Sequence, residues 1–233
     1  MKMKWYSLAR LITPILFSLL MLFGILWKNL FLIAILMGSS LFLGAFHCGW
    51  LCPFGFIQDI LGKLGKALKL PRLKIPAKID RFLRFSRYIL FGLSFLGLGF
   101  LYFIGTPYTT VQSFVYGNIA PIGWGVGLYL GAFLILALMT DRPFCRYFCT
   151  EGARYGLVSM GRLFSIRRNK ESCIDCKLCS KACPMGIDVS QVNHVRNGQC
   201  INCFECVAAC PKENTLQYGW AFKKSDKETK DEE

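Results

Sequence analysis

Eight of the twelve cysteines stand in two runs with the same spacing. Residues 173–184 read CIDCKLCSKACP and residues 200–211 read CINCFECVAACP. Each run has the form C-x-x-C-x-x-C-x-x-x-C-P, the bacterial run that binds cubane [4Fe–4S] clusters. Three thiolates on one tight loop reach three irons of a cube, and the fourth cysteine serves the other cluster. We therefore predict two clusters, with the ligands Cys173, Cys176, Cys179 and Cys210 for the first, and Cys200, Cys203, Cys206 and Cys183 for the second.

Two other uses of cysteine fit these runs less well. A structural zinc site uses two pairs of ligands, and a repeated four-cysteine run that ends in proline is not its pattern. Disulfides are disfavoured in a reducing compartment. The two complete runs therefore favour iron–sulfur clusters.

The other four cysteines form two pairs, each behind a long apolar run. Residues 46–59 read FHCGWLCPFGFIQD and residues 143–156 read PFCRYFCTEGARYG. Cysteines four apart lie on one face of a helix, and aligning the two stretches also matches Gly55 with Gly152. We interpret the stretches as two copies of one motif. The paired cysteines are Cys48 with Cys52, and Cys145 with Cys149.

Two pairs at equivalent places predict a further redox site. A parallel repeat would bring the four thiolates to one point, where they can hold a [2Fe–2S] or a [4Fe–4S] cluster. Two alternatives stay open. The thiols could cycle through a disulfide without metal, or they could pack as small apolar side chains.

The apolar composition predicts a membrane protein. Of the 233 residues 54% are hydrophobic and 18% are charged, and residues 88–140 hold no Asp, Glu, Lys or Arg. A spanning helix needs about 20 apolar residues to cross a hydrocarbon core about 30 Å thick. A cleaved signal peptide over residues 1–28 is the competing interpretation, but no small-residue cleavage site follows it. We predict an α-helical membrane protein with four transmembrane helices as two tandem hairpin repeats, over residues 8–27, 30–47, 88–105 and 122–140.

The basic residues predict the orientation in the cell (inner) membrane. Residues 63–87 hold nine Lys or Arg and one acidic residue, and residues 141–172 hold seven basic and three acidic residues. By the positive-inside rule, both termini and both cysteine pairs lie on the cytoplasmic side and residues 106–121 lie outside. The chain has a net charge of +14, and we interpret its basic residues as groups that bind anionic lipid headgroups rather than nucleic acid.

The changes in composition along the chain predict three parts. Residues 1–165 form the four-helix membrane domain, and residues 166–220 form a small cytoplasmic α+β domain, ferredoxin-like, with two [4Fe–4S] clusters. Residues 221–233 form a charged, disordered tail.

Few other residues suit cofactor chemistry. His47 and His194 are the only histidines, so a haem held by two histidines within the membrane is excluded, and His194 is interpreted as a packing residue. His47, Gln58 and Asp59 cluster near the first cysteine pair, where they could move protons or bind a quinone oxygen. Helix capping or interfacial hydration explains these three residues equally well.

These motifs resemble the NapH/NosR-type family of polytopic membrane iron–sulfur proteins. Members combine transmembrane hairpins, two C-x-x-x-C-P motifs and a pair of cytoplasmic ferredoxin motifs, and the likeness covers about residues 8–215. CGWLCPFG at residues 48–55 matches the first family motif. CRYFCTEG at residues 145–152 departs from it, because Thr150 stands where the pattern has proline.

The resemblance implies electron transfer between the quinone pool, or a cytoplasmic donor, and an extracytoplasmic reductase. The chain is then an electron-transfer subunit that passes electrons between its [4Fe–4S] clusters and a partner in or across the membrane. Its expected partners are the other subunits of a membrane redox complex, and any flavin or haem is expected in such a partner. The alternatives are a quinol dehydrogenase with its own quinone site, and a redox-sensing or metal-reducing assembly protein.

Overall fold

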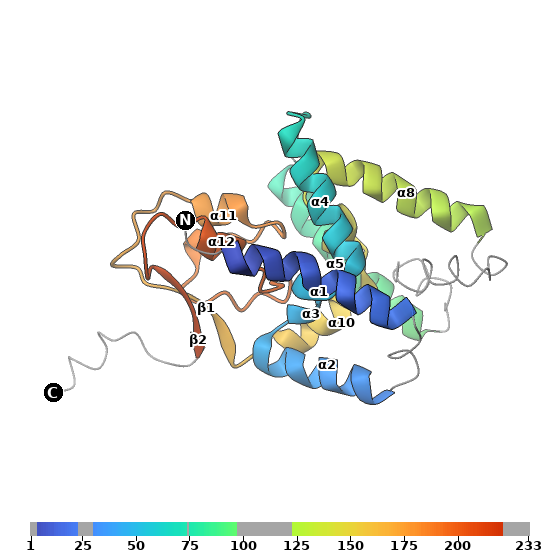
Figure 1. Ribbon diagram of the computed structural model, residues 1–233, viewed down its shortest axis with the longest axis horizontal. Coiled ribbons are helices and arrows are strands. Elements are labelled where there is room, and N and C mark those ends of the chain that lie inside the picture. The colour runs from blue at the N-terminus through green and yellow to red at the C-terminus, as the bar shows by residue number, and fades with distance from the viewer. Residues whose placement is uncertain (1–3, 23–29, 74, 97–122, 221–233) are drawn as a thin grey trace. The chain divides into compact units, whose positions relative to one another are not determined.

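The chain divides into two compact units, and Figure 1 labels most of the helices and strands described below. The computed structural model of the protein describes residues 4–22, 30–73, 75–96 and 123–220. Unit 1 comprises the described residues of Met1–Tyr6, Leu30–His47 and Tyr155–Glu233. Unit 2 comprises the described residues of Ser7–Asn29 and Cys48–Arg154. The eight cysteines of the two runs therefore belong to unit 1, and the four paired cysteines belong to unit 2.

Unit 2 is built from helices in its described part. These are most of α1 (Lys4–Leu22), α4 (Pro53–Ala67), α5 (Ala77–Phe95), α8 (Gly123–Met139) and α9 (Pro143–Tyr147). The chain passes from one unit to the other within α3 (Phe46–Trp50) and within α10 (Thr150–Ser159). Helices α4 and α9 carry proline in the first turn. Proline fits there because the N–H that it lacks would have no partner within the helix.

Helix α4 packs against α8, and two glycines of α4, Gly62 and Gly65, lie at this contact. Gly55, Gln58, Gly62 and Gly65 are buried at spacings of three or four, which places them on one side of the helix. A Cβ atom on Gly65 would lie 1.8 Å from the carbonyl oxygen of Leu138. The two backbones can approach this closely only because glycine has no side chain.

An aromatic core in unit 2 lies beside the paired cysteines. Phe54, Leu130 and Phe144 are buried together, and Cys52 and Cys149 pack against them. The rings of Phe54 and Phe144 meet edge to face, with centroids 5.2 Å apart. Edge-to-face contact is a favourable arrangement of aromatic rings, and it joins the start of α4 to α9.

Unit 1 contains a two-stranded antiparallel sheet whose strands lie on either side of the cysteine runs in the sequence. The strands are β1 (Phe164–Arg168) and β2 (Leu216–Trp220), with Ile166 opposite Tyr218. Helix α2 (Leu30–Leu43) packs against β1. The short elements between the strands are α11 (Leu178–Ala182), η1 (Val189–Gln191) and α12 (Glu205–Ala208).

The predicted domain boundary between residues 165 and 166 falls inside unit 1, because Tyr155 and the residues after it pack with the C-terminal part. Because the two units are defined by contacts alone, the division into a membrane domain and a ferredoxin-like domain stays a prediction. The charged segment 221–233 lies outside the described residues.

The prediction of four membrane-spanning helices is wrong for the part of the chain that the structure describes. No helix in that part is both long and apolar enough to cross a bilayer. Helices α2 and α8 have 14 and 17 residues, or about 21 and 26 Å at 1.5 Å per residue, against a hydrocarbon core of about 30 Å. Helix α1 has 19 residues but includes Pro14 and the buried Arg10.

Helix α5 departs from the prediction in its position. It begins at Ala77 rather than at residue 88, and five charged residues precede Tyr88 within it. The predicted turn at residues 27–29, the end of the third predicted span and the predicted outer loop 106–121 lie outside the described residues.

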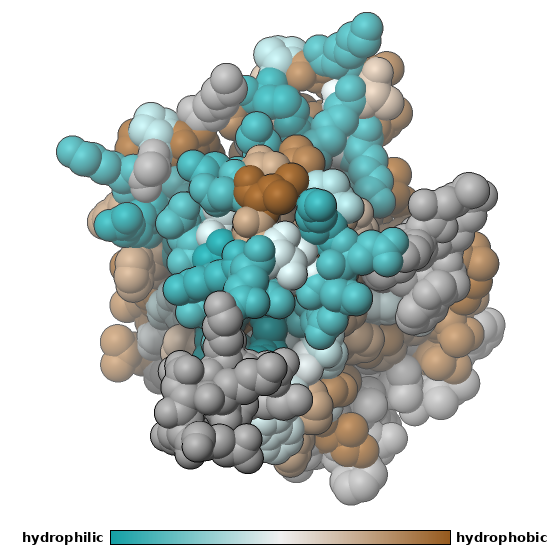
Figure 2. Space-filling model, turned by 90° about the vertical axis from the view of Figure 1, so that its left-hand side faces the viewer, coloured by the Kyte–Doolittle hydropathy of each residue, from teal (hydrophilic) through white to brown (hydrophobic). Residues whose placement is uncertain are grey.

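The surface carries apolar side chains among hydrophilic ones, as the face drawn in Figure 2 shows. In unit 2, one side of α1 is exposed and apolar, at Leu8, Leu11, Ile12, Ile15, Leu16 and Leu19. Helix α5 also exposes apolar side chains, at Ile79, Phe82, Phe85 and Ile89. Apolar faces of this kind are typical of surfaces that meet another protein or a lipid phase.

Candidate iron–sulfur sites

The two cysteine runs adopt the same backbone conformation. The third and fifth positions of each run have positive φ, at Asp175 (51°) and Lys177 (58°) in the first run and at Asn202 (47°) and Phe204 (59°) in the second. Asp and Asn adopt this left-handed conformation more readily than most residues. The fifth position directly precedes α11 in one run and α12 in the other. Each of the two segments with this cysteine spacing therefore folds into a tight loop followed by one short helix.

The first pocket, called the first tail site below, gathers cysteines from both runs. Arg168, Lys177 and Lys212 line it as well, and they give it a basic rim. Cys176 is exposed and Cys173 is partly exposed, so this pocket lies near solvent. Its cysteines are Cys173, Cys176 and Cys179 of the first run and Cys210 of the second.

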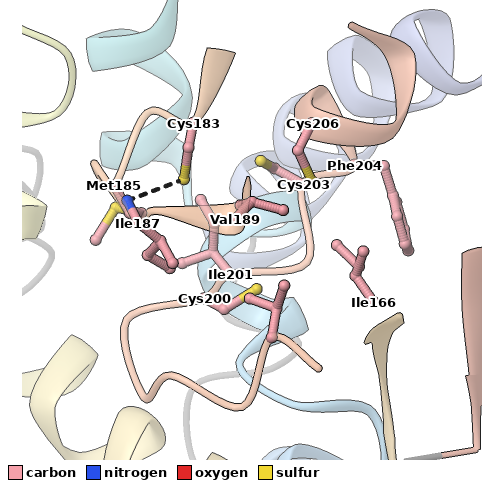
Figure 3. A pocket seen from close by; sticks show the side chains of 11 residues that line it. Ile166, Cys183, Met185, Ile187, Val189, Cys200, Ile201, Cys203, Phe204 and Cys206 are labelled. Atoms are coloured by element: carbon pink, nitrogen blue, oxygen red, sulfur yellow. Dashed lines mark hydrogen bonds between the residues drawn. The ribbon is translucent and has the colours of Figure 1, made fainter. Parts of the chain in front are cut away.

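The second pocket, called the second tail site, is enclosed by apolar side chains (Figure 3). They include Ile166 of β1, Met185 and Phe204. Its cysteines are Cys200, Cys203 and Cys206 of the second run and Cys183 of the first. The backbone N–H of Ile187 donates to the Cys183 sulfur at 3.4 Å, the dashed line in Figure 3.

The donor sets of both pockets suit [4Fe–4S] clusters. Each pocket takes three cysteines from one loop and its fourth from the other run, which is the arrangement of two-cluster ferredoxins. In the described part of the chain, no three Cys, His, Asp or Glu side chains gather tightly enough for a single metal ion. A cubane takes one thiolate on each iron, so its four ligands stand around a cluster rather than around a single ion.

The two tail sites differ in their electrostatic surroundings. The backbone N–H of Asp175 and the guanidinium of Arg168 hold the pKa of Cys173 below its ordinary value, and Arg168 Nη1 lies 3.5 Å from the Cys173 sulfur. In the second tail site, burial and then the neighbouring Cys203 raise the pKa of Cys206. Cys173 of the first tail site therefore favours negative charge on its sulfur more than Cys206 of the second does, although burial also raises the pKa of Cys179 in the first tail site.

A buried arginine forms hydrogen bonds with backbone carbonyl groups at the loop of the second tail site. Arg162 is 0% exposed, and its Nη2 donates to the carbonyl oxygens of Val195 at 2.6 Å and Asn197 at 2.9 Å. Its Nη1 lies 3.4 Å from the carbonyl oxygen of Cys200. No residue type indicates this role in advance, because every residue carries a backbone carbonyl.

The four paired cysteines come together within unit 2 to form what is called the paired-cysteine site below. Burial and then the thiols of Cys145, Cys48 and Cys52 raise the pKa of Cys149 well above its ordinary value. Burial also raises the pKa of Cys145 to about 12. Thiols in such surroundings stay protonated on their own, and a bound metal ion deprotonates them. The arrangement thus suits a metal-bound group in which four thiolates share one space.

The two copies of the motif have matching local geometry. Helix α4 begins directly after Cys52 and helix α10 directly after Cys149. The backbone N–H of Gly152 donates to the Cys149 sulfur at 3.3 Å, and the N–H of Gly55 likewise bonds to Cys52. Thr150 therefore starts a helix at the place where the first copy has proline.

Residues of α4 connect the first cysteine pair to the second. Asp59 forms an ion pair with Arg142, with Nε–Oδ1 and Nη2–Oδ2 distances of 2.6 Å. Arg142 Nη1 donates to the carbonyl oxygen of Cys48 at 2.9 Å. Gln58 Nε2 lies 3.1 Å from the Cys145 sulfur. Sequence reasoning missed Arg142; its only signal is its place three residues before Cys145.

The residues considered for quinone have other partners. Gln58 bonds to the second cysteine motif, and Asp59 bonds to Arg142 and, at 2.6 Å, to Arg10. The ring centroid of His47 lies 5.3 Å from that of Tyr155. His194, predicted to be a packing residue, forms a β-bridge with Arg167 and is partly buried. The structure thus gives the side chains of Gln58 and Asp59 structural partners near the cysteines.

Comparison with known proteins finds two iron–sulfur families in this chain. Residues 9–71 and 122–171 match the family described as "4Fe-4S binding domain", and residues 165–211 match the family described as "4Fe-4S dicluster domain". The first match contains the four paired cysteines and the second contains both cysteine runs. No solved structure gives a significant match.

Curated relatives extend the likeness over most of the chain. YccM of Escherichia coli is 37% identical over 196 residues, which cover 81% of this chain and 55% of YccM. The uncharacterized protein MJ0750 of Methanocaldococcus jannaschii is 33% identical, with 79% of this chain and 76% of MJ0750 covered. The regulatory protein NosR of Pseudomonas aeruginosa is 31% identical, with 77% and 27% covered. The chain thus spans about half the length of YccM and about a quarter of NosR. On these matches and its iron–sulfur motifs, the chain belongs to the NapH/NosR-type family of iron–sulfur electron-transfer proteins.

Proposed function

We propose that the protein carries electrons through two [4Fe–4S] clusters in its C-terminal part. The observation that carries the proposal is the division of eight cysteines between two pockets, each with its fourth cysteine from the other run. When bound, such clusters accept and release single electrons. The chain holds them, shields the second tail site with apolar side chains and leaves the first near solvent. The proposed ligands are Cys173, Cys176, Cys179 and Cys210, and Cys200, Cys203, Cys206 and Cys183.

Serine substitutions test the exchange of the fourth ligand. In the full chain, purified without oxygen, Cys210→Ser should alter the same EPR signal as Cys176→Ser, although Cys210 belongs to the other run. Cys183→Ser should alter the same signal as Cys203→Ser. If Cys210→Ser instead alters the signal that Cys203→Ser alters, the assignment is wrong and each run binds its own cluster.

We propose a further iron–sulfur cluster at the paired-cysteine site. The shared burial of the four thiols supports it, as does the match of both motifs to a 4Fe-4S binding family. Two cubanes account for about eight irons, so the full chain should contain about two irons more for a [2Fe–2S] cluster or about four more for a cubane. Cys48→Ser or Cys149→Ser should remove only this excess. Iron at eight per chain, with the four thiols fully titratable, would exclude this cluster and leave the two alternatives that bind no metal.

We propose that the protein works on the cytoplasmic side of a membrane as part of a redox complex. The exposed apolar side chains of α1 and α5 support this location, together with the basic residues between 63 and 87. Cell fractionation should find the protein with the membranes. Protease added to intact spheroplasts should leave the C-terminal segment 221–233 uncut. Recovery from the membrane-free fraction would contradict the location.

A further inference from the structure

Gln58 of α4 reaches across to the second cysteine pair. Its side chain is 0% exposed, and its Nε2 lies 3.1 Å from the Cys145 sulfur. Its Oε1 accepts a hydrogen bond from the backbone N–H of Phe144 at 3.2 Å. A backbone N–H can only donate, so the amide oxygen must face Phe144. This fixes the orientation of the amide group and directs its N–H at the sulfur.

The surroundings hold the amide in this place. Gln58 Nε2 also lies 3.4 Å from the carbonyl oxygen of Phe54, and the rings of Phe54 and Phe144 pack against each other. The next residue, Asp59, holds Arg142 just before α9. Two consecutive residues of α4 thus fix the segment that carries Cys145. Because Gln58 is fully buried, water does not weaken its N–H···S contact.

We propose that Gln58 raises the reduction potential of the cluster held by the four paired cysteines, acting through the Cys145 sulfur. The inference rests on the further cluster proposed above. Reduction adds one negative charge, which the ligand sulfurs share. An N–H aimed at a ligand sulfur stabilises the reduced state more than the oxidised state and so raises the potential.

The test is an EPR-monitored redox titration of the full chain, purified without oxygen, together with iron quantitation. Gln58→Met and Gln58→Leu both remove the donor while keeping a side chain of similar size. Ser86→Ala is the matched control, because the Ser86 hydroxyl bonds to the carbonyl oxygen of Tyr147, between Cys145 and Cys149, without touching a sulfur. The two tail clusters serve as an internal reference for a folded chain.

In both Gln58 variants we expect unchanged iron and a fall in the midpoint potential of one centre. The tail centres and the Ser86→Ala protein should keep their wild-type midpoints. Wild-type midpoints in both Gln58 variants with full iron would overturn the inference and leave the further cluster standing. An equal shift in Ser86→Ala, or loss of the extra iron in both Gln58 variants, would also overturn it, since Gln58 would then only support the fold. A wild-type chain with only about eight irons would instead refute the cluster itself.

Discussion

Arg142 holds both carboxylate oxygens of Asp59 at 2.6 Å, although 83 residues separate the two in the chain. Arg142 is 1% exposed and also bonds to the carbonyl oxygen of Cys48. One guanidinium therefore joins α4, the first cysteine pair and the start of α9. Because each charge in such a pair is withdrawn from water, removing one partner leaves the other uncompensated.

Asp59→Asn should lower the free energy of unfolding by about 3–5 kcal/mol, the usual cost of breaking a buried ion pair from one side. Urea unfolding followed by circular dichroism measures it. Asp141→Asn is the matched control, because Asp141 pairs with Lys66 and Arg72 while 28% of its side chain is exposed. The control should lose about 1 kcal/mol or less. Equal losses of unfolding free energy in the two variants would contradict the prediction that the ion pair of Asp59 contributes more to stability than those of Asp141.

Asp80 should make stability depend on pH in the acid range. Burial raises the pKa of Asp80, but hydrogen bonds from Tyr147, Arg84 and Arg146 outweigh burial and hold the pKa below its usual value. A carboxyl with a lowered folded-state pKa stabilises the fold above its unfolded pKa of about 3.9, and this stability is lost as pH falls through the folded pKa. The difference in unfolding free energy between wild type and Asp80→Asn should therefore be constant near pH 7 and shrink below about pH 4. Parallel pH profiles would argue against this prediction.

Arg168→Gln should lower the midpoint potential of one tail cluster. Arg168 lies beside the Cys173 sulfur, and its positive charge stabilises the more negative, reduced state. Arg167→Gln is the control, because neighbouring residues of a strand point to opposite faces. Redox titration should show a shift in the signal assigned to the first tail site by Cys176→Ser, and none in Arg167→Gln. A shift of both tail signals would mean that Arg168 acts on the fold rather than on one site.

Gly65→Ala should separate α4 from α8. The added methyl group would lie 1.8 Å from the Leu138 carbonyl oxygen, so the backbones must move. We expect a loss of about 1–3 kcal/mol in unfolding free energy, the usual cost of overpacking. Gly131→Ala on α8 is the control, because no atom outside its chain neighbours and the adjoining backbone of the helix lies within 4 Å of its added Cβ. It should be neutral or stabilising by up to about 1 kcal/mol, since alanine favours helix.

The sequence predicted the parts of these sites that depend on local spacing. The C-x-x-C-x-x-C runs form compact loops with neighbours along the chain, so their geometry follows from a dozen residues. That the two cysteine pairs come together was predicted from the repeat alone. Partners such as Gln58 and Phe144 were missed because 86 residues separate them and neither residue type is specific to metal sites.

The prediction of spanning helices failed because composition measures apolar content and not where helices begin or end. Residues 88–140 are free of charge, yet α5 begins at Ala77. Helix α1 also buries the charged Arg10, whose partner Asp59 lies 49 residues away and so cannot be recognised from the neighbouring sequence.

The two cysteine loops have left-handed residues at the same two positions, so one backbone conformation serves both tail sites. The segments CIDCKLC and CINCFEC impose the same path on the backbone, with Asp175 and Asn202 at corresponding turns. What distinguishes the two sites is the side chains around the loops: a basic rim at one and an apolar shell at the other. Substitutions in the surroundings can therefore alter the properties of either proposed centre, without changing the seven-residue segment that carries three of its proposed ligands.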